Sequence, residues 1–200
     1  MERLGILGGT FDPPHNGHLA LAAGSLHQLR LTGVLWVLTP DPPHKDRPDL
    51  TPYTLRRKML QAAIGGNPAF TLCEVELERP GPHYMTDTIR ILRQRNPSAE
   101  FTLLLGEDSL RDLPDWHRPQ DLLHLCRLAV MRRSGAKADM VLLESVLPGI
   151  GSRTTFLDSA PMDVSSTEIR ERVKHGEKIE DLVPGAVAKI IHRESLYRSA

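Results

Sequence analysis

The sequence predicts an α/β protein with a doubly wound parallel sheet and helices on both faces, in three layers. Short apolar runs alternate along the chain with segments of helical periodicity, which is typical of strand–helix–strand units with right-handed crossovers. Glycine or proline residues separate these segments. The 200 residues are 40% hydrophobic, enough for a sizeable core. We expect one domain over residues 1–200, with a helical part from about residue 165.

The first half of the chain predicts three strands, each followed by a helix. The first strand ends at a glycine pair, and the helix after it places Leu19, Ala22 and Leu26 at helical spacing. Gly33 ends this helix and opens the second strand, and a polar, proline-rich loop then leads to the second helix. In order, we predict strand 3–7, helix 16–29, strand 34–38, helix 53–64, strand 70–77 and helix 85–95.

The second half predicts three further strands and two helices. Residues 101–105 are a continuous apolar run, as in a strand that is buried on both faces. Ser165 and Glu168 have the spacing of a capping box, so a helix begins at residue 166. Ligands of such sheets bind beyond the carboxyl ends of the strands, so the loops there are the candidate sites. We predict strands 101–105, 128–131 and 153–157, and helices from residues 166 and 184 onward.

The composition argues against several classes of function. The chain has 25 basic and 25 acidic side chains and a formal charge of zero, so no global field attracts nucleic acid or an anionic membrane. No apolar run approaches the roughly 20 residues of a membrane span, and no secretory signal is apparent. Cys73 and Cys126 lie in apolar segments, where small buried thiols are expected. We therefore expect a cytoplasmic enzyme.

The loop after the first predicted strand, residues 8–18, predicts an anion site. Gly8 and Gly9 let the backbone approach a bound group closely. The helix that follows directs its free N–H groups and the positive end of its dipole at the same place. His15 and His18 share one face of its first turn. The loop has neither the G-x-G-x-x-G spacing of dinucleotide-binding folds nor the Gly-Lys-Ser/Thr end of a Walker loop.

Two other interpretations of this loop are open. It could be a tight strand–helix turn with two incidental histidines, although the convergence of two histidines and Asp12 favours a functional site. His15 and His18 also have a spacing that suits zinc, with Asp12 as a third ligand. An electropositive helix end suits phosphate better than a dication, so we predict no metal held directly by the protein.

Residues 8–13, followed by His15-x-Gly17-His18, resemble the signature of the HxGH nucleotidyltransferase superfamily. Within it, they are most similar to the bacterial nicotinate-nucleotide adenylyltransferases. The resemblance implies a Rossmann-like fold and contacts of both histidines with the phosphates of ATP. By the same resemblance, the ATP site includes Gly8, Gly9, Thr10, Phe11 and Gly17.

A second loop, near the C-terminus, resembles the second signature of the family, Ile-Ser-Ser-Thr-x-Ile-Arg, with Val164 in place of the isoleucine. Its helix start offers N–H groups and hydroxyls to an anion, and the fork of Arg170 could grip phosphates in a bidentate manner. The resemblance implies that Ser165, Ser166 and Thr167 bind the triphosphate. It also implies that Arg170 contacts the departing pyrophosphate.

Two more strand ends resemble the family at positions that face ATP. Gly106 would admit close approach of the nucleotide, and Asp108 is either an acceptor for ribose hydroxyls or a helix N-cap. Residues 132–135 match the family at the end of the fifth strand. Arg133 is the candidate ATP contact there, although the sequence does not decide between Arg132 and Arg133.

Three segments resemble those that hold the mononucleotide in the family. Residues 42–45 match its Pro-Pro-His-Lys loop and make Lys45 a candidate phosphate contact. The family pattern Ser/Thr-Tyr-Thr-x-x-Thr recurs at residues 83–88 with Met85 in place of a threonine, so backbone N–H groups would carry the contact there. Trp116 has the position of the aromatic residue that stacks on nicotinate, or else anchors its loop. The predicted acceptor residues are Lys45, Tyr84, Met85, Thr88, Trp116 and His117.

The resemblance implies adenylyl transfer from ATP to nicotinate mononucleotide, giving deamido-NAD and pyrophosphate in NAD biosynthesis. Such transfer depends on alignment and charge neutralisation, so we predict direct in-line attack without a covalent enzyme intermediate. His15, His18 and Arg170 are the predicted catalytic residues, and Mg²⁺ accompanies ATP. The expected partners are ATP and nicotinate mononucleotide, with no nucleic acid or membrane, and a homo-oligomer is compatible with the sequence.

Three other functions are compatible with parts of the sequence. A sister enzyme, such as a pantetheine-phosphate adenylyltransferase or a cytidylyltransferase, tends to lack the Trp116 loop and the pattern over 84–88. A noncatalytic nucleotide-binding sensor would keep the fold, but the presence of His15, His18 and Arg170 argues against it. A His-metal hydrolase would require a bound metal, which metal analysis of the purified protein detects.

Overall fold

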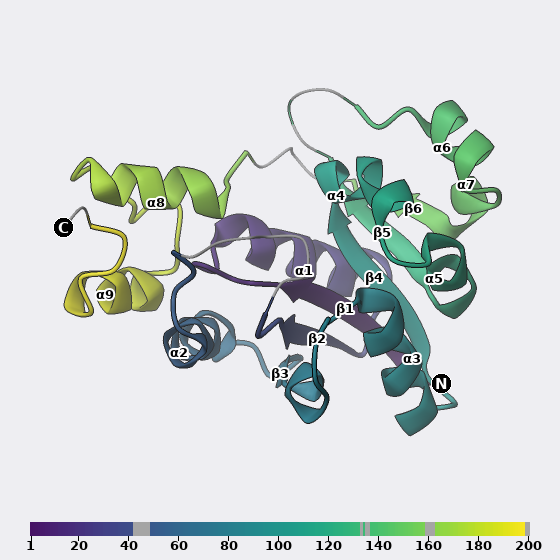
Figure 1. Ribbon diagram of the computed structural model, residues 1–200, viewed down its shortest axis with the longest axis horizontal. Helices are drawn as coiled ribbons and strands as arrows, with labels where there is room; N and C mark the ends of the chain where they lie inside the picture. The colour runs from purple at the N-terminus through teal and green to yellow at the C-terminus, as the bar shows by residue number, and fades with distance from the viewer. Residues whose placement is uncertain (42–48, 133, 135–136, 159–162, 199–200) are drawn as a thin grey trace.

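In the part of the chain that the structure describes, six strands form one parallel sheet in the order β3-β2-β1-β4-β5-β6, which confirms the predicted doubly wound α/β fold (Figure 1). The order reverses between β1 and β4, and ligands of such sheets bind at the crevice beside that point. The computed structural model describes residues 1–41, 49–132, 134, 137–158 and 163–198.

The strands begin and end close to the predicted residues, with one exception. They are β1 (Arg3–Gly9), β2 (Gly33–Leu38), β3 (Phe70–Cys73), β4 (Glu100–Gly106), β5 (Arg127–Met131) and β6 (Thr154–Phe156). The strand predicted over 70–77 is wrong beyond Cys73, where a 3₁₀ turn, η1 (Val75–Glu78), follows. The turn carries Val75 into the core but leaves Leu77 51% exposed, so the apolar alternation does not continue a strand.

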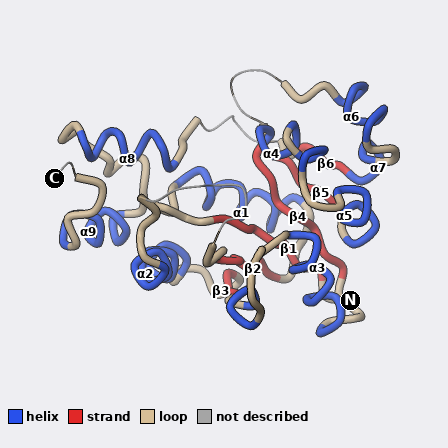
Figure 2. The backbone as a smooth tube through the Cα atoms, in the orientation of Figure 1, coloured by secondary structure: helices blue, strands red, loops and turns tan. Residues whose placement is uncertain are grey.

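Helices cover both faces of the sheet, and the tube in Figure 2 shows how they alternate with the strands. Those that the sequence predicts are α1 (Asn16–Gln28), α2 (Tyr53–Ile64), α3 (Met85–Arg95), α8 (Ser166–Lys174) and α9 (Gly185–Arg193). Shorter helical segments link the later strands, and they are too short for hydrophobic periodicity to reveal them. These are α4 (Glu107–Arg111), η2 (Leu113–Asp115), α5 (Pro119–Leu125), α6 (Met140–Val146) and α7 (Ile150–Arg153). Within the described ranges, none of the helices is long and apolar enough to cross a membrane.

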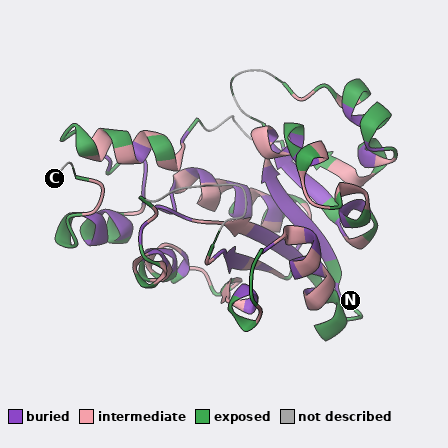
Figure 3. Ribbon diagram, viewed as in Figure 1, coloured by how far each residue is buried: buried purple, intermediate pink, exposed green. Residues whose placement is uncertain are grey.

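Buried side chains form a core on each face of the sheet, and Figure 3 shows the central strands buried between the helices. Along β4, Leu103 and Leu105 join the cluster under α3 and α5, whereas Leu104 joins the cluster under α1 and α2. This alternation arises because successive residues of a strand point to opposite faces. Burial raises the pKa of the Cys126 thiol to about 12, so Cys126 is the buried, protonated thiol that its apolar segment predicts.

A third cluster attaches the C-terminal helices to the rest of the fold. Ile169 of α8 and Val187 of α9 pack in one cluster with Met59 of α2. Since α2 follows the loop after β2, this packing fixes α8 and α9 beside the ends of the central strands. Elements from opposite ends of the chain therefore meet next to the crevice.

Candidate active site

A cleft of about 350 Å³ lies where β1 and β4 end, at the reversal of strand order. Each residue predicted for catalysis or ATP binding lines it, except Arg133, which lies outside the described residues. Ser109, Met131 and Val164 also line the cleft and are not among the predicted residues. Among the described residues, the lining consists of Gly8, Gly9, Thr10, Phe11, His15, Gly17, His18, Gly106, Asp108, Ser109, Met131, Val164, Ser165, Ser166, Thr167 and Arg170.

His15 and His18 lie side by side at the start of α1, as their spacing predicts. Their rings stack with centroids 3.6 Å apart and an interplanar angle of 24°. The backbone N–H of His15, the N-cap residue, donates to Nδ1 of His18 at 3.2 Å. Because Nδ1 accepts this bond, the neutral ring of His18 carries its proton on Nε2, which makes Nε2 a donor. The Phe11 ring meets the His18 ring edge-on at 5.0 Å and supports its orientation.

Gly17 provides the space that the His15 ring occupies. A Cβ added at Gly17 would lie 3.0 Å from Nδ1 and 3.1 Å from Cε1 of His15, closer than ordinary van der Waals contact. The glycine between the two histidines therefore has a steric role. At Gly106, which also lines the cleft, the space is open, because a Cβ added there would meet no atom within 4 Å.

The C-terminal loop contacts the N-terminal loop directly. Ser165 caps α8 by accepting the N–H of Glu168 at 3.1 Å, which confirms the predicted helix start. Two side chains of α8 bind the loop after β1. Nη1 of Arg170 donates to the carbonyl of Asp12 at 2.8 Å, and Oγ of Ser166 donates to the carbonyl of Pro13 at 2.9 Å.

Arg170 is also fixed within its own helix. Its Nη2 lies 3.1 Å from Oγ1 of Thr167, so the guanidinium bridges α8 and the N-terminal loop. The two helix starts, far apart in the sequence, thus line one cleft.

Asp12 is engaged by the protein rather than arranged as a metal ligand. It is 0% exposed, and its carboxylate accepts the hydroxyl of Tyr197 at 2.7 Å and the N–H of Thr51 at 3.4 Å. Among the described residues, no group of three His, Cys, Asp or Glu side chains is placed to hold a metal ion. The arrangement therefore gives no support to the zinc alternative with His15 and His18.

Arg56 of α2 binds the loops after β1 and β2, and no sequence pattern predicts this role. The side chain is 1% exposed, although an arginine on an amphipathic helix is usually solvated. Its guanidinium donates to four carbonyls at 2.8 to 2.9 Å, those of Thr10, Thr39, Pro40 and Thr51. One buried cation thereby ties the loops after β1 and β2 to α2.

Asp108 is not a helix N-cap, so that alternative is wrong. Gly106 occupies the N-cap position of α4, and Asp108 is the second residue of the helix. Its Oδ1 lies 3.3 Å from Nη2 of Arg111, and its side chain is 46% exposed at the cleft. The carboxylate is therefore accessible to a ligand.

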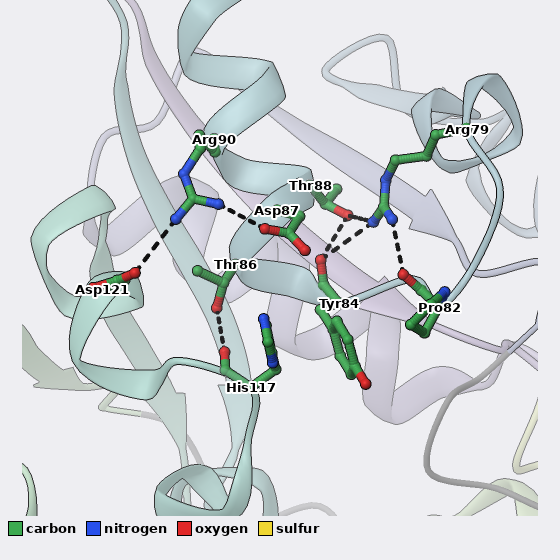
Figure 4. Close-up of polar contacts among 9 residues, drawn as sticks. All are labelled: Arg79, Pro82, Tyr84, Thr86, Asp87, Thr88, Arg90, His117 and Asp121. Carbon is green, nitrogen blue, oxygen red and sulfur yellow. Dashed lines mark hydrogen bonds and ion pairs between the residues drawn. The ribbon is translucent and has the colours of Figure 1, made fainter.

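Several of the predicted acceptor residues gather at the start of α3 (Figure 4). The Tyr84 ring stacks on the His117 ring with centroids 4.1 Å apart and an angle of 16°. Oγ1 of Thr86 donates to the carbonyl of His117 at 2.7 Å, which fastens this loop to the helix. Met85 connects the group to the cleft, since a Cβ added at Gly8 would lie 2.1 Å from its methyl carbon.

The remaining acceptor candidates are Thr88, Trp116 and Lys45. Thr88 is 0% exposed, and its hydroxyl donates to Oε1 of Glu76 at 2.6 Å and accepts from Arg79 at 3.2 Å. It stabilises the start of α3 from inside the protein, and its contact with a ligand stays a prediction. Trp116 is half-buried and packs against the core cluster, as a loop anchor would, and its stacking on a ligand stays a prediction. Lys45 lies outside the described residues.

Comparison with known proteins agrees with the class that this fold and cleft define. A family model described as cytidylyltransferase-like matches residues 6–172, so this is a nucleotidyltransferase of the cytidylyltransferase-like class. The nicotinate-nucleotide adenylyltransferase of Bacillus subtilis is 39% identical over 199 residues, which cover 100% of both chains. A protein of Thermomicrobium roseum, named as a probable nicotinate-nucleotide adenylyltransferase, is 40% identical over 199 residues, 100% of this chain and 93% of that one. The chain belongs to the nicotinate-nucleotide adenylyltransferase family.

Solved structures share the fold at lower sequence identity. A nicotinic acid mononucleotide adenylyltransferase of Plasmodium falciparum, complexed with NaAD, is similar with a TM-score of 0.82 and 19% identity over 98% of both chains. The same enzyme complexed with APC gives a TM-score of 0.81 and 18% identity. At these identities the likeness concerns the fold, which is the Rossmann-like fold that the resemblance implies.

Proposed function

We propose that this protein transfers the adenylyl group of ATP to nicotinate mononucleotide, forming deamido-NAD and pyrophosphate in NAD biosynthesis. One observation carries the proposal: the helix start with His15 and His18 and the helix start with Arg170 line one cleft. Both helix ends direct N–H groups and partial positive charge at an anion, and a triphosphate offers charge to both. Relatives with this named activity match the whole chain.

The transfer is a direct displacement at phosphorus. A phosphate oxygen of the mononucleotide attacks the α-phosphorus of ATP. The bond from this phosphorus to the oxygen that bridges to the β-phosphate breaks, and pyrophosphate leaves with that oxygen. His15, His18 and Arg170 neutralise the charge that develops on the transferred and departing groups. No protein nucleophile takes part, so ATP alone leaves no adenylyl or phosphoryl group on the purified protein.

Mg²⁺ would accompany ATP. The cleft is rich in N–H, hydroxyl, imidazole and guanidinium donors, which fit phosphate oxygens. Phosphate oxygens and water would supply the ligands of the ion, while Asp108, which lines the cleft, would accept hydroxyls of the ribose. When bound, the ion offsets part of the triphosphate charge.

The acceptor site lies at the start of α3. Backbone N–H groups there would bind the nicotinate carboxylate, and the aromatic faces of Tyr84, Trp116 and His117 would cover the ring. Met85 lies against Gly8, which supports an acceptor site beside the nucleotide cleft. The predicted roles of Lys45 and Arg133 as phosphate contacts are part of the same proposal.

The whole chain would act as one catalytic unit. The helical part from about residue 165 supplies Arg170 and packs on α2 through Met59. Half of the triphosphate site therefore depends on the C-terminal helices.

An assay of product formation tests the proposal. Purified protein is incubated with ATP and Mg²⁺ and with one acceptor: nicotinate mononucleotide, nicotinamide mononucleotide or phosphopantetheine. We expect deamido-NAD and pyrophosphate in equal amounts with nicotinate mononucleotide and a lower kcat/KM with the amide, which lacks the negative charge. A preference for phosphopantetheine would indicate a sister transferase, and nucleotide binding without pyrophosphate release would indicate a sensor.

Replacing Gly17 by alanine is expected to lower kcat/KM for ATP by tenfold to about a hundredfold, because the added methyl group displaces the His15 ring from His18. The unfolding free energy should not fall in parallel, since alanine favours a helix by about 0.5–1 kcal/mol over glycine. Gly24→Ala in the same helix is the control, because its nearest contact would be 3.9 Å. Unchanged kcat/KM in Gly17→Ala would contradict the steric role of this glycine.

A further inference from the structure

We infer that Tyr197, near the C-terminus, is a positioning residue for the nucleotide cleft and acts through Asp12. The inference rests on the proposed function, because it concerns the loop that would bind ATP. Tyr197 itself does not line the cleft. The Tyr197 hydroxyl donates to the carboxylate of Asp12, and the backbone carbonyl of Asp12 accepts a hydrogen bond from Arg170.

Asp12 links the two contacts within one residue. Oδ1 of Asp12 accepts the Tyr197 hydroxyl at 2.7 Å, across 185 residues of sequence. The carbonyl of Asp12 accepts Nη1 of Arg170 at 2.8 Å. A shift of Asp12 therefore moves the acceptor that orients the guanidinium, and it also moves the loop that leads to His15.

The surroundings of Tyr197 keep its hydroxyl a hydrogen-bond donor to Asp12. Burial, and then the charge of Asp12, raise the pKa of the Tyr197 hydroxyl, so it keeps its proton and remains a donor. Its hydroxyl also lies 3.9 Å from Sδ of Met59, within the cluster that holds α8 and α9. The backbone of Tyr197 has a φ of 63°, a left-handed conformation that is unfavourable for tyrosine. Surrounding contacts must maintain that conformation.

Loss of the hydroxyl would leave Asp12 short of a donor in a buried site. A buried acceptor that loses one of its donors is destabilised, and more strongly if it is charged. The loop can reduce this cost by moving Asp12 toward water or another donor. Such a movement misplaces Arg170 and His15 relative to the phosphates, and misplacement by about 1 Å can lower a rate by a hundredfold.

The experiment compares Tyr197→Phe with Tyr53→Phe. Tyr53 is a matched control, because its hydroxyl also donates to a carboxylate, Oε1 of Glu74 at 2.9 Å, but outside the cleft. Steady-state assays with nicotinate mononucleotide give kcat and both KM values. Calorimetry gives the Kd of a non-hydrolysable ATP analogue, and thermal unfolding gives Tm.

For Tyr197→Phe we expect kcat/KM for ATP to fall about tenfold and the Kd of the analogue to rise severalfold, with KM for the acceptor unchanged. Tyr53→Phe should keep all of these values within about twofold of wild type. If Tyr197→Phe and Tyr53→Phe lose affinity and Tm alike, or if Tyr197→Phe binds the analogue like wild type, Tyr197 is not a positioning residue.

Asp12→Asn provides a second route to the same contact if Tyr197→Phe folds poorly. It keeps the shape of the side chain but weakens the bond to Tyr197, and the Kd of the ATP analogue should rise again. In the double variant the two effects should not add, because both remove one interaction. Additive effects would overturn the inference. The Kd readout needs no turnover, so failure of wild-type adenylyl transfer would overturn only the proposed function.

Discussion

Replacement of His18 by alanine should lower kcat by about 10²–10³-fold, the loss that follows when one donor to a developing charge is removed. The His15 N–H bond places the ring proton of His18 on Nε2, and stacking on His15 fixes the plane of the ring. Alanine removes this donor without filling the cleft. Steady-state rates of pyrophosphate release measure the effect.

His27→Ala is the control for His18→Ala. His27 lies in the last turn of the same helix and is exposed, so its removal should leave kcat within about twofold of wild type. Circular dichroism and thermal unfolding of both variants separate loss of activity from loss of structure. A folded His18→Ala protein with wild-type kcat would show that charge stabilisation belongs to other groups.

Replacement of Arg56 by methionine should lower the free energy of unfolding by about 3–5 kcal/mol, because several carbonyls lose their donor and each buried acceptor left unsatisfied costs about 1–3 kcal/mol. Methionine fills much of the volume but supplies no donor, so the carbonyls of Thr10, Thr39 and Pro40 lose the guanidinium. Because these carbonyls belong to the loops beside the cleft, ATP affinity should fall as well. Urea unfolding measures the first effect, and titration with an ATP analogue measures the second.

Arg57→Met is the matched control for Arg56→Met. The adjacent arginine pairs with Glu74 at 2.9 Å, but it lies at the surface, where solvent weakens such a pair. Its loss should cost far less stability and leave ATP affinity unchanged. Equal destabilisation by the two substitutions would mean that the four carbonyl bonds of Arg56 do not hold the loops together.

The sequence predicts those parts of the site whose residues lie together in short continuous segments. Gly8, His15 and His18 lie within one turn-and-helix segment, and Ser165 and Arg170 lie within another, so local rules for helix starts suffice. The parallel sheet follows in the same way from apolar runs alternating with helical periodicity. That the two segments share one cleft was implied by the family resemblance.

The remaining parts depend on contacts that no local pattern encodes. Arg56 reaches the carbonyl of Thr10 across 46 residues, and its helix gives the periodicity of an ordinary amphipathic segment. Tyr197 reaches Asp12 across 185 residues. The end of β3 was predicted wrongly for a related reason, since whether Leu77 is buried depends on the fold around it.

The contact between Tyr197 and Asp12 has a consequence for the order in which the molecule assembles. Consecutive strands such as β1 and β2 join through single crossovers, and the pairing of β1 with β4 joins Arg3 to Glu100. The contact between Tyr197 and Asp12 spans 185 residues, and longer loops carry a larger entropic penalty on closing. We therefore expect this contact, and with it the finished phosphate pocket, to form after the central strands have paired. Nucleotide would then bind to the completed native state alone and shift the equilibrium toward it.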